Sequence, residues 1–154
     1  MKKTRINFVC LGNICRSPMA EFIAADMIKK RGLESVISVY SSALSDEEHG
    51  NPVYPPALQE LKKHGVPTYP HYANLVTMSQ YENYDLFVCM EGYQIARLKS
   101  RFGGDKENKV HLLLDYAKGR KGDDIADPWY TGNFKSTYED LVEGITALLD
   151  EIVK

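Results

Sequence analysis

Short apolar runs alternate along the chain with longer stretches in which apolar residues recur at helical spacing. The apolar, β-prone runs predict four strands, at 5–9, 35–42, 84–90 and 110–114. The helical spacing predicts helices at 18–31, 55–64, 93–101 and 136–152, with a short helical turn at 77–83. The last helix starts with what reads as a capping box, from Ser136 to Glu139.

The order of these elements predicts the fold. Strands that alternate with helices run parallel, because each helix returns the chain to the same end of the sheet. We therefore expect an α/β fold in a single domain over 1–154, with a four-stranded, parallel, doubly wound sheet and helices on both faces. Ligands bind such sheets beyond the carboxyl ends of the strands. The segment 115–135 follows the fourth strand and has no periodicity, which is uncommon unless a segment is functional.

The composition is that of an ordinary globular protein: 154 residues, 44% apolar and 26% charged, with a formal net charge of −2. This charge balance does not favour a nucleic-acid partner. No apolar run reaches membrane-spanning length, and the first residues lead directly into a strand, so we expect no membrane partner and a cytoplasmic location. The three cysteines argue against a disulfide framework, and none of them pairs with another cysteine or a histidine at zinc-finger spacing.

The segment between the first strand and the first helix holds a thiol and a guanidinium. Five residues separate Cys10 from Arg16, Ser17 suits the helix cap, and Pro18 suits the first helical position. Such a loop directs backbone N–H groups and a helix N-terminus to one point, which makes an N-terminal phosphate-binding loop.

The side chains of this loop suit phosphoryl transfer. The positive end of the helix dipole favours a thiolate at Cys10, which would be the nucleophile. Arg16 can bind two equatorial oxygens of a phosphoryl group at once, which lysine cannot do. Gly12 permits close backbone approach and a positive φ, and Asn13 is the next most tolerant residue for that conformation.

Residues 10–18, Cys-Leu-Gly-Asn-Ile-Cys-Arg-Ser-Pro, resemble the signature loop of the low-molecular-weight protein tyrosine phosphatases. The resemblance implies hydrolysis of phosphotyrosine in a protein or peptide through a cysteinyl-phosphate intermediate, with no metal or organic cofactor. It implies that the phosphate-binding residues are Leu11, Gly12, Asn13, Ile14, Cys15, Arg16 and Ser17.

The general acid is expected to be a carboxyl on a mobile loop, within reach of the leaving phenolate. Asp127-Pro128-Trp129-Tyr130 resembles the aspartate motif of the family, which selects Asp127 and leaves Asp123 and Asp124 as alternatives. Trp129 and Tyr130 would wall the pocket for an aryl substrate.

The resemblance assigns supporting roles as well. The Ser17 hydroxyl is expected to hydrogen-bond the thiolate of Cys10 and to help it leave in the second step. His71 is expected to hydrogen-bond Asn13, with Ser41 as a second brace, and neither would transfer protons.

Two further positions keep alternatives open. Cys15 is either a packing residue or the partner of Cys10 in a reversible disulfide formed under peroxide. Glu47 stands where many members of the family carry a pocket tryptophan, so it would make the rim acidic. The chain is expected to be a monomer or a weak homodimer.

Three rival functions fit parts of the pattern. An arsenate reductase on this fold needs a second redox cysteine pair, and only Cys89 is available, inside a strand. By the same resemblance, a protein arginine phosphatase of this fold would carry threonine where this chain has Ile14. An inactive phosphotyrosine-binding module would have no use for Asp127.

Overall fold

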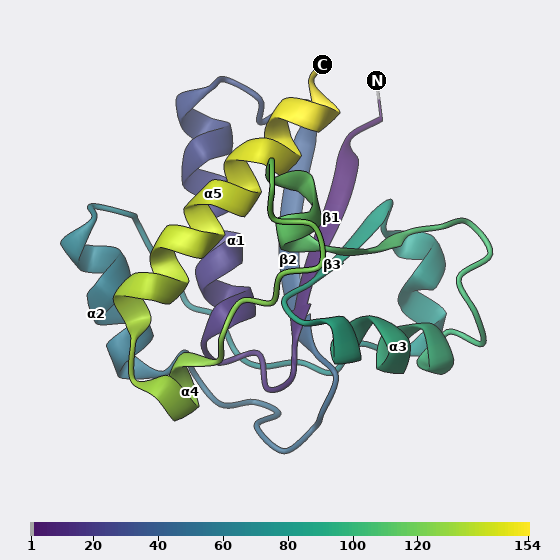
Figure 1. Ribbon diagram of the computed structural model, residues 1–154, viewed down its shortest axis with the longest axis horizontal. Helices are drawn as coiled ribbons and strands as arrows, with labels where there is room; N and C mark the ends of the chain where they lie inside the picture. Colours follow the sequence, from purple (N-terminus) through teal and green to yellow (C-terminus); the bar gives the residue numbers. More distant parts are fainter. Residues whose placement is uncertain (1) are drawn as a thin grey trace.

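The computed structural model describes residues 2–154 and has the expected α/β architecture (Figure 1). Four parallel strands form one sheet in the order β2-β1-β3-β4. The strands are β1 Thr4–Cys10, β2 Ile37–Ala43, β3 Leu86–Cys89 and β4 Val110–Leu112. The helices are α1 Arg16–Lys30, α2 Pro55–Lys63, α3 Gly92–Arg101, α4 Pro128–Thr131 and α5 Phe134–Ile152, and two 3₁₀ helices are η1 Met78–Asn83 and η2 Leu113–Tyr116. None of the helices within 2–154 is long and apolar enough to cross a membrane.

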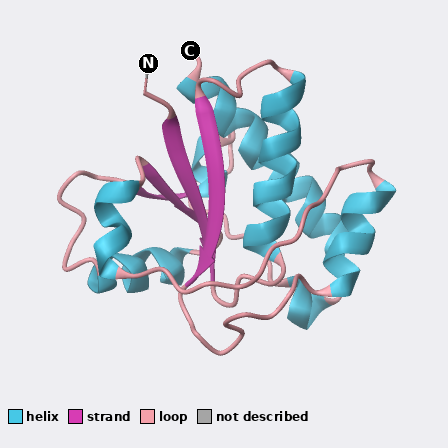
Figure 2. Cartoon of the chain, turned by 180° about the vertical axis from the view of Figure 1, so that it is seen from behind, coloured by secondary structure: helices cyan, strands magenta, loops and turns pink. Residues whose placement is uncertain are grey.

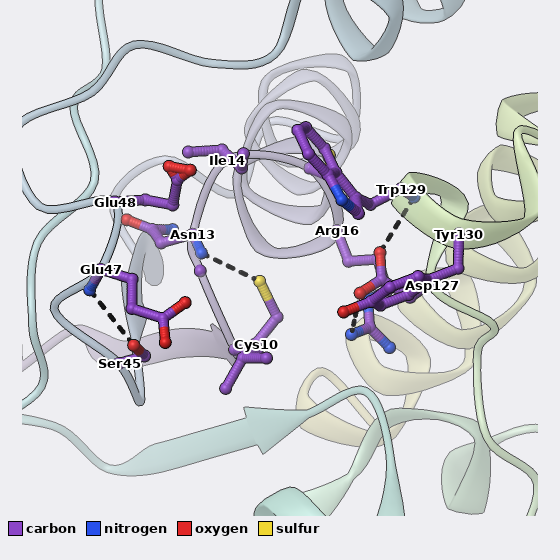
Figure 3. Close-up of a pocket in the computed structure, with 13 residues that line it drawn as sticks. Cys10, Asn13, Ile14, Arg16, Ser45, Glu47, Glu48, Asp127, Trp129 and Tyr130 are labelled. Carbon is purple, nitrogen blue, oxygen red and sulfur yellow. Dashed lines mark hydrogen bonds and ion pairs between the residues drawn. The ribbon is translucent and has the colours of Figure 1, made fainter.

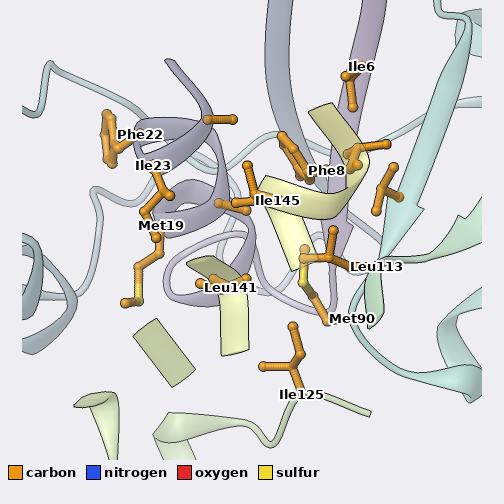
Figure 4. Close-up of a cluster of buried hydrophobic side chains, with 14 of the residues drawn as sticks. Ile6, Phe8, Met19, Phe22, Ile23, Met90, Leu113, Ile125, Leu141 and Ile145 are labelled. Atoms are coloured by element: carbon orange, nitrogen blue, oxygen red, sulfur yellow. The ribbon is translucent and has the colours of Figure 1, made fainter. Parts of the chain in front are cut away.

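Helices cover both faces of the sheet (Figures 1 and 2). On one face α1 and α5 pack on the sheet and on each other, and the larger apolar core there includes Phe8, Met19 and Ile145 (Figure 4). On the other face α3 packs against β3 and β4 around a smaller core that includes Phe87 and Leu98. Because both faces are buried, the central strand β3 and the second half of β1 are apolar, as expected for a parallel sheet, whereas the edge strand β2 carries three serines.

The parallel register brings the carboxyl ends of the strands to one edge of the sheet. Cys10 of β1 lies beside Ala43 of β2, and Cys89 of β3 lies beside Leu112 of β4. The expected nucleophile therefore lies at the edge where such sheets bind ligands.

Close packing of α5 holds the segment that follows β4. A Cβ added at Gly144 of α5 would lie 2.6 Å from Cγ of Leu113, so glycine allows α5 and η2 to approach this closely. The segment that leads to Asp127 therefore starts from η2, which is held firmly against α5.

Two capping predictions are wrong. The first helix begins at Arg16, and Cys15 is its N-cap without a side-chain hydrogen bond. Ser17 does not cap this helix, because its hydroxyl contacts the Cys10 sulfur instead, and Pro18 takes the third helical position.

The start of the last helix is the second wrong capping prediction. The helix begins at Phe134, two residues before the predicted box, and the side chain of Asn133 accepts a hydrogen bond from Ser136 N (2.9 Å). Ser136 is therefore a donor inside the first turn rather than the cap.

Strand boundaries also differ from the predictions. The apolar run 110–114 leaves the sheet after Leu112, because Leu113 and Leu114 are buried in η2 against α5. Periodicity cannot separate a buried strand from such a turn. The strands β2 and β3 are likewise shifted or shortened by one or two residues at their ends, and the aperiodic segment contains the short helix α4.

Candidate active site

The loop between β1 and α1 wraps around the sulfur of Cys10 (Figure 3). The backbone N–H of Asn13 donates to Cys10 Sγ (3.3 Å), and Oγ of Ser17 lies 3.0 Å from the same sulfur. An N–H group and a hydroxyl that both face one sulfur suit a negatively charged thiolate.

The conformation of the loop depends on Asn13. Its φ is 60°, in the left-handed region, and Gly12 is not in that region, so the positive φ falls on the asparagine rather than on the glycine. Asparagine tolerates this conformation better than most residues. A Cβ at Gly12 would lie 3.4 Å from Cγ of Glu48, which is an ordinary van der Waals contact, so packing within the chain does not require glycine there.

The Asn13 side chain is held on both sides. Its Nδ2 donates to Ser17 Oγ (2.6 Å) and Ser41 Oγ (3.1 Å). Its Oδ1 accepts from Asn74 N (3.2 Å) and lies 3.0 Å from His71 Nε2. Since Oδ1 is an acceptor here, the His71 ring donates from Nε2. The expected contacts of His71 and Ser41 with Asn13 are thus both present.

Two residues that sequence reasoning missed complete this network. Glu21 of α1 is only 6% exposed, and it accepts hydrogen bonds from Ser41 Oγ (2.7 Å) and from the Tyr69 hydroxyl. Burial lowers the pKa of His71, and the attraction of the Glu21 carboxylate, 3.6 Å away, offsets this only partly. Burial and the bond to Glu21 raise the pKa of Tyr69. No sequence motif marks Glu21 or Tyr69.

Arg16 lies at the start of α1 and is 2% exposed. Its Nη1 donates to the Ile125 carbonyl (2.8 Å) and lies 3.0 Å from Glu91 Oε2, while its Nη2 lies 3.3 Å from Asp127 Oδ2. Burial by itself would lower the pKa of Arg16, but the negative charges of Cys10, Asp127 and Glu91 outweigh burial and raise it. The guanidinium is therefore fixed as a cation at the pocket floor.

Sequence reasoning also missed Glu91. It is the N-cap of α3, two residues after the end of β3, and forms a capping box with Gln94. A carboxylate immediately beyond a central strand, at the same sheet edge as Cys10, was the available signal.

The structure distinguishes the three candidate acids. Asp127 caps α4, its Oδ1 accepts from Trp129 N (3.1 Å), and its other oxygen faces Arg16. Asp123 pairs with Arg120 (2.7 Å), and Asp124 accepts from Gly92 N (2.8 Å). Asp127 lines the pocket, and neither alternative does.

The pocket above the loop has a volume of about 180 Å³. Trp129, Tyr130 and Asp127 lie on one side and Ser45, Glu47 and Glu48 on the other (Figure 3). The lining residues are Cys10, Leu11, Gly12, Asn13, Ile14, Cys15, Arg16, Ser45, Glu47, Glu48, Asp127, Trp129 and Tyr130. His71 and Ser41 are absent from this lining and act on the loop from behind.

Residues 5–154 match the family described as low molecular weight phosphotyrosine protein phosphatase. The chain belongs to this family.

Named relatives of this phosphatase family are similar over nearly the whole chain. The low molecular weight protein-tyrosine-phosphatase YfkJ of Bacillus subtilis is 35% identical over 147 residues, which cover 96% of this chain and 94% of that protein. PtpA of Staphylococcus aureus is 32% identical over 149 residues, which cover 97% of this chain and 94% of that protein.

Solved structures of the phosphatase family agree in fold. The crystal structure of YfkJ has a TM-score of 0.95 at 33% identity, covering 99% of this chain and 96% of that chain. SP-PTP of Streptococcus pyogenes has a TM-score of 0.86 at 30% identity, covering 96% of this chain and 92% of that chain.

Cys15, the second cysteine of this phosphatase loop, also lines the pocket. Burial, followed by the negative charges of Cys10 and Asp127, raises its pKa to about 12. Cys15 is consequently a neutral thiol at physiological pH and does not compete with Cys10 as a nucleophile.

Proposed function

We propose that this chain is a protein tyrosine phosphatase that hydrolyses phosphotyrosine in proteins or peptides. The observation that carries the proposal is the convergence of Cys10, Arg16 and Asp127 on one pocket. The names of its relatives support the same activity.

In the first step, the Cys10 thiolate attacks phosphorus, so an S–P bond forms while the P–O bond to the tyrosine breaks. Arg16 and the backbone N–H groups of 11–16 hold the equatorial oxygens and neutralise their charge. Asp127 gives its proton to the leaving phenolate oxygen. The position of Asp127, beside Arg16 and against the aromatic wall, supports this role.

In the second step, the Asp127 carboxylate takes a proton from a water molecule that attacks the cysteinyl-phosphate. The S–P bond breaks, inorganic phosphate leaves, and Cys10 returns to the thiolate. The Ser17 hydroxyl, 3.0 Å from the sulfur, supports the leaving thiolate. Both steps use only groups of the chain and water, with no metal or organic cofactor.

Three observations weigh against the rivals. An arsenate reductase on this fold needs a second redox cysteine pair, and besides the two loop cysteines the chain has only Cys89, which is fully buried in β3. Ile14 gives the pocket an apolar side chain, which suits an aryl ring better than a guanidinium. Asp127, oriented by Trp129 N and Arg16, has no purpose in a protein that only binds phosphotyrosine.

We infer the cellular location from the chemistry of the thiols. The protein has three free cysteines, and its nucleophile has to stay reduced, so we place it in the cytoplasm. The proposed steps use side chains and backbone groups of a single chain, so we propose a monomer or a weak homodimer.

We also propose that Cys15 protects Cys10. Peroxide oxidises the Cys10 thiolate to a sulfenic acid, and the Cys15 thiol condenses with it to a disulfide with loss of water. After peroxide and then dithiothreitol, wild type should regain more activity than Cys15→Ala, in which Cys10 proceeds to sulfinic acid. Equal recovery in the two proteins would refute the role.

The test of the proposed function is turnover of a phosphotyrosine peptide, phosphoarginine and, with a thiol reductant, arsenate by wild type, Cys10→Ser and Asp127→Ala. We expect only the peptide to be turned over efficiently, and Cys10→Ser to be inactive. Asp124→Ala is the matched control for Asp127→Ala, because Asp124 accepts a hydrogen bond from Gly92 N and does not line the pocket. Faster turnover of phosphoarginine or arsenate, or binding without turnover, would contradict the proposal.

A further inference from the structure

The mouth of the pocket has two walls of different character. Trp129 and Tyr130, which are 53% and 79% exposed, form an aromatic wall at the start of α4. Glu47 and Glu48 form an acidic wall opposite (Figure 3). A substrate that enters the pocket passes between an apolar surface and two carboxylates.

The size of the pocket fixes what reaches the acidic wall. Its volume of about 180 Å³ is below the roughly 300–1,000 Å³ of sites that enclose a drug-sized ligand. The pocket therefore receives one side chain, and the residues that flank this side chain in a protein stay on the rim. There they meet Glu47, whose side chain is exposed.

The rim carries no compensating cation. Arg16 is the one lysine or arginine among the lining residues, and it is buried and paired with Glu91 and Asp127. Within residues 2–154, no ion pair engages Asp46, Glu47 or Glu48. The Glu47 charge is thus free to act on a bound peptide.

The acidic wall is also anchored to the catalytic loop. Leu44 N donates to the Cys10 carbonyl and Ser45 N to the Leu11 carbonyl, each at 3.0 Å. Glu47 N in turn donates to Ser45 Oγ (3.2 Å). These bonds fix the backbone of Glu47 relative to the nucleophile, so its side chain starts from a defined position on the rim of the pocket.

We propose that Glu47 determines specificity and selects phosphotyrosine sites flanked by lysine or arginine over sites flanked by aspartate or glutamate. The inference rests on the proposed phosphatase function and adds the class of substrate. A flanking cation pairs with the Glu47 carboxylate, whereas a flanking carboxylate is repelled by it. Glu48 lies deeper, over Gly12, and its Oε2 accepts from Asn51 Nδ2 (3.1 Å), so it reaches the flanking residues less well.

The experiment compares kcat/KM for two phosphotyrosine peptides that differ only in carrying lysine or glutamate beside the phosphotyrosine. N-acetyl-phosphotyrosine amide, which has no flanking residues, is the reference substrate. For wild type at low ionic strength, we expect the lysine peptide to be preferred about threefold to tenfold, the range of one or two exposed charge pairs. In about 1 M salt, where the screening length is about 3 Å, the preference should shrink towards one.

Three variants connect the preference to one residue. Glu47→Gln should lower the preference by more than half, and Glu47→Lys should reverse it. Asp46→Asn removes the same charge from the neighbouring exposed residue, which does not line the pocket, and should change the preference less.

The outcomes separate this inference from the proposed function. Equal kcat/KM for the two peptides in wild type, or equal effects of Glu47→Gln and Asp46→Asn, would overturn the inference and leave the phosphatase function intact. Failure to turn over either peptide or the reference amide would overturn both.

Discussion

Arg16 and Asp127 form an ion pair across the pocket, with Nη2 of Arg16 3.3 Å from Oδ2 of Asp127. One residue starts α1 after the phosphate-binding loop, and the other caps α4 more than a hundred residues later in the chain. The ion pair fixes the position of Arg16, which is proposed to bind the phosphate, relative to Asp127, the proposed acid. A change at either residue therefore affects the position of the other.

Replacing Asp127 should slow the reaction by a factor that depends on the pKa of the leaving group. Without a proton donor, Asp127→Asn should lose about 10²–10⁴-fold in kcat for phosphotyrosine, because the phenolate leaves unprotonated. For p-nitrophenyl phosphate, whose leaving group is more acidic, the first step should be affected much less. The measurement is the rate of the first step in Asp127→Asn for a series of aryl phosphates whose leaving groups differ in pKa. If this rate depends on the leaving-group pKa as weakly as it does in wild type, Asp127 is not the acid.

Arginine at position 16 should not be replaceable by lysine, although the charge is kept. A lysine ammonium cannot contact Glu91, Asp127 and the Ile125 carbonyl while also binding two phosphate oxygens. We expect Arg16→Lys to lower kcat/KM by at least about 10²-fold and to weaken inhibition by inorganic phosphate.

Arg120→Lys is the matched control for Arg16→Lys. Arg120 also faces several carboxylates, those of Asp123, Asp140 and Glu143, but on the surface and outside the pocket. Its replacement should leave kcat/KM within about twofold. Comparable losses in the two variants would mean that Arg16 acts through stability rather than through phosphate binding.

Removing the hydroxyl of Tyr69 should destabilise the protein. In Tyr69→Phe, the buried Glu21 carboxylate loses one of its donors, which should cost about 1–3 kcal/mol of unfolding free energy. Tyr72→Phe alters a residue that is 59% exposed and should cost less than about 0.5 kcal/mol. Urea unfolding of both variants measures the difference, and equal effects would contradict the network.

Contiguity explains which parts of the site the sequence could predict. The phosphate-binding loop runs without interruption from Cys10 to Arg16, and Asp127 lies in a local motif with Trp129, so both were visible. Glu21, Tyr69 and Glu91 act through contacts made only on folding, and a sequence shows no local sign of such contacts.

The element order was predictable, and the helix caps were not. Ser17 and Ser136 both have the residue type and spacing of caps, yet Ser17 bonds the nucleophile, and Ser136 donates its N–H to Asn133. A serine that can cap can equally bond a side chain that folding brings near it. The fourth strand was overestimated because Leu113 and Leu114 are as buried as the strand itself.

His71 should make stability depend on pH. Burial lowers its pKa below the ordinary value of 6.5, so the native state binds this proton less readily than the unfolded chain does. As the pH falls below about 6.5, the unfolded chain is protonated first, and the free energy of unfolding decreases. Glu21, Asn13 and Ser41 are the polar groups that face the ring.

Unfolding by urea between about pH 5 and pH 8 tests how stability depends on pH, because this range covers the titration of histidine. His71→Gln should show a flatter dependence below about pH 6.5 than wild type. His49→Gln, at an exposed position, should keep the wild-type dependence. A His71→Gln profile parallel to that of wild type would show that His71 is not the group responsible.

The central claim is that the phosphoryl group passes through the sulfur of Cys10, and trapping the intermediate tests it most directly. Asp127→Ala with p-nitrophenyl phosphate forms the intermediate without needing the acid but lacks the base that hydrolyses it, so the cysteinyl-phosphate should accumulate. After an acid quench, mass spectrometry should find one phosphoryl group on the peptide that contains Cys10, and none in the protein with Cys10→Ser added. A burst of p-nitrophenol without phosphoryl-Cys10, or a phosphoryl group that survives Cys10→Ser, would contradict the account.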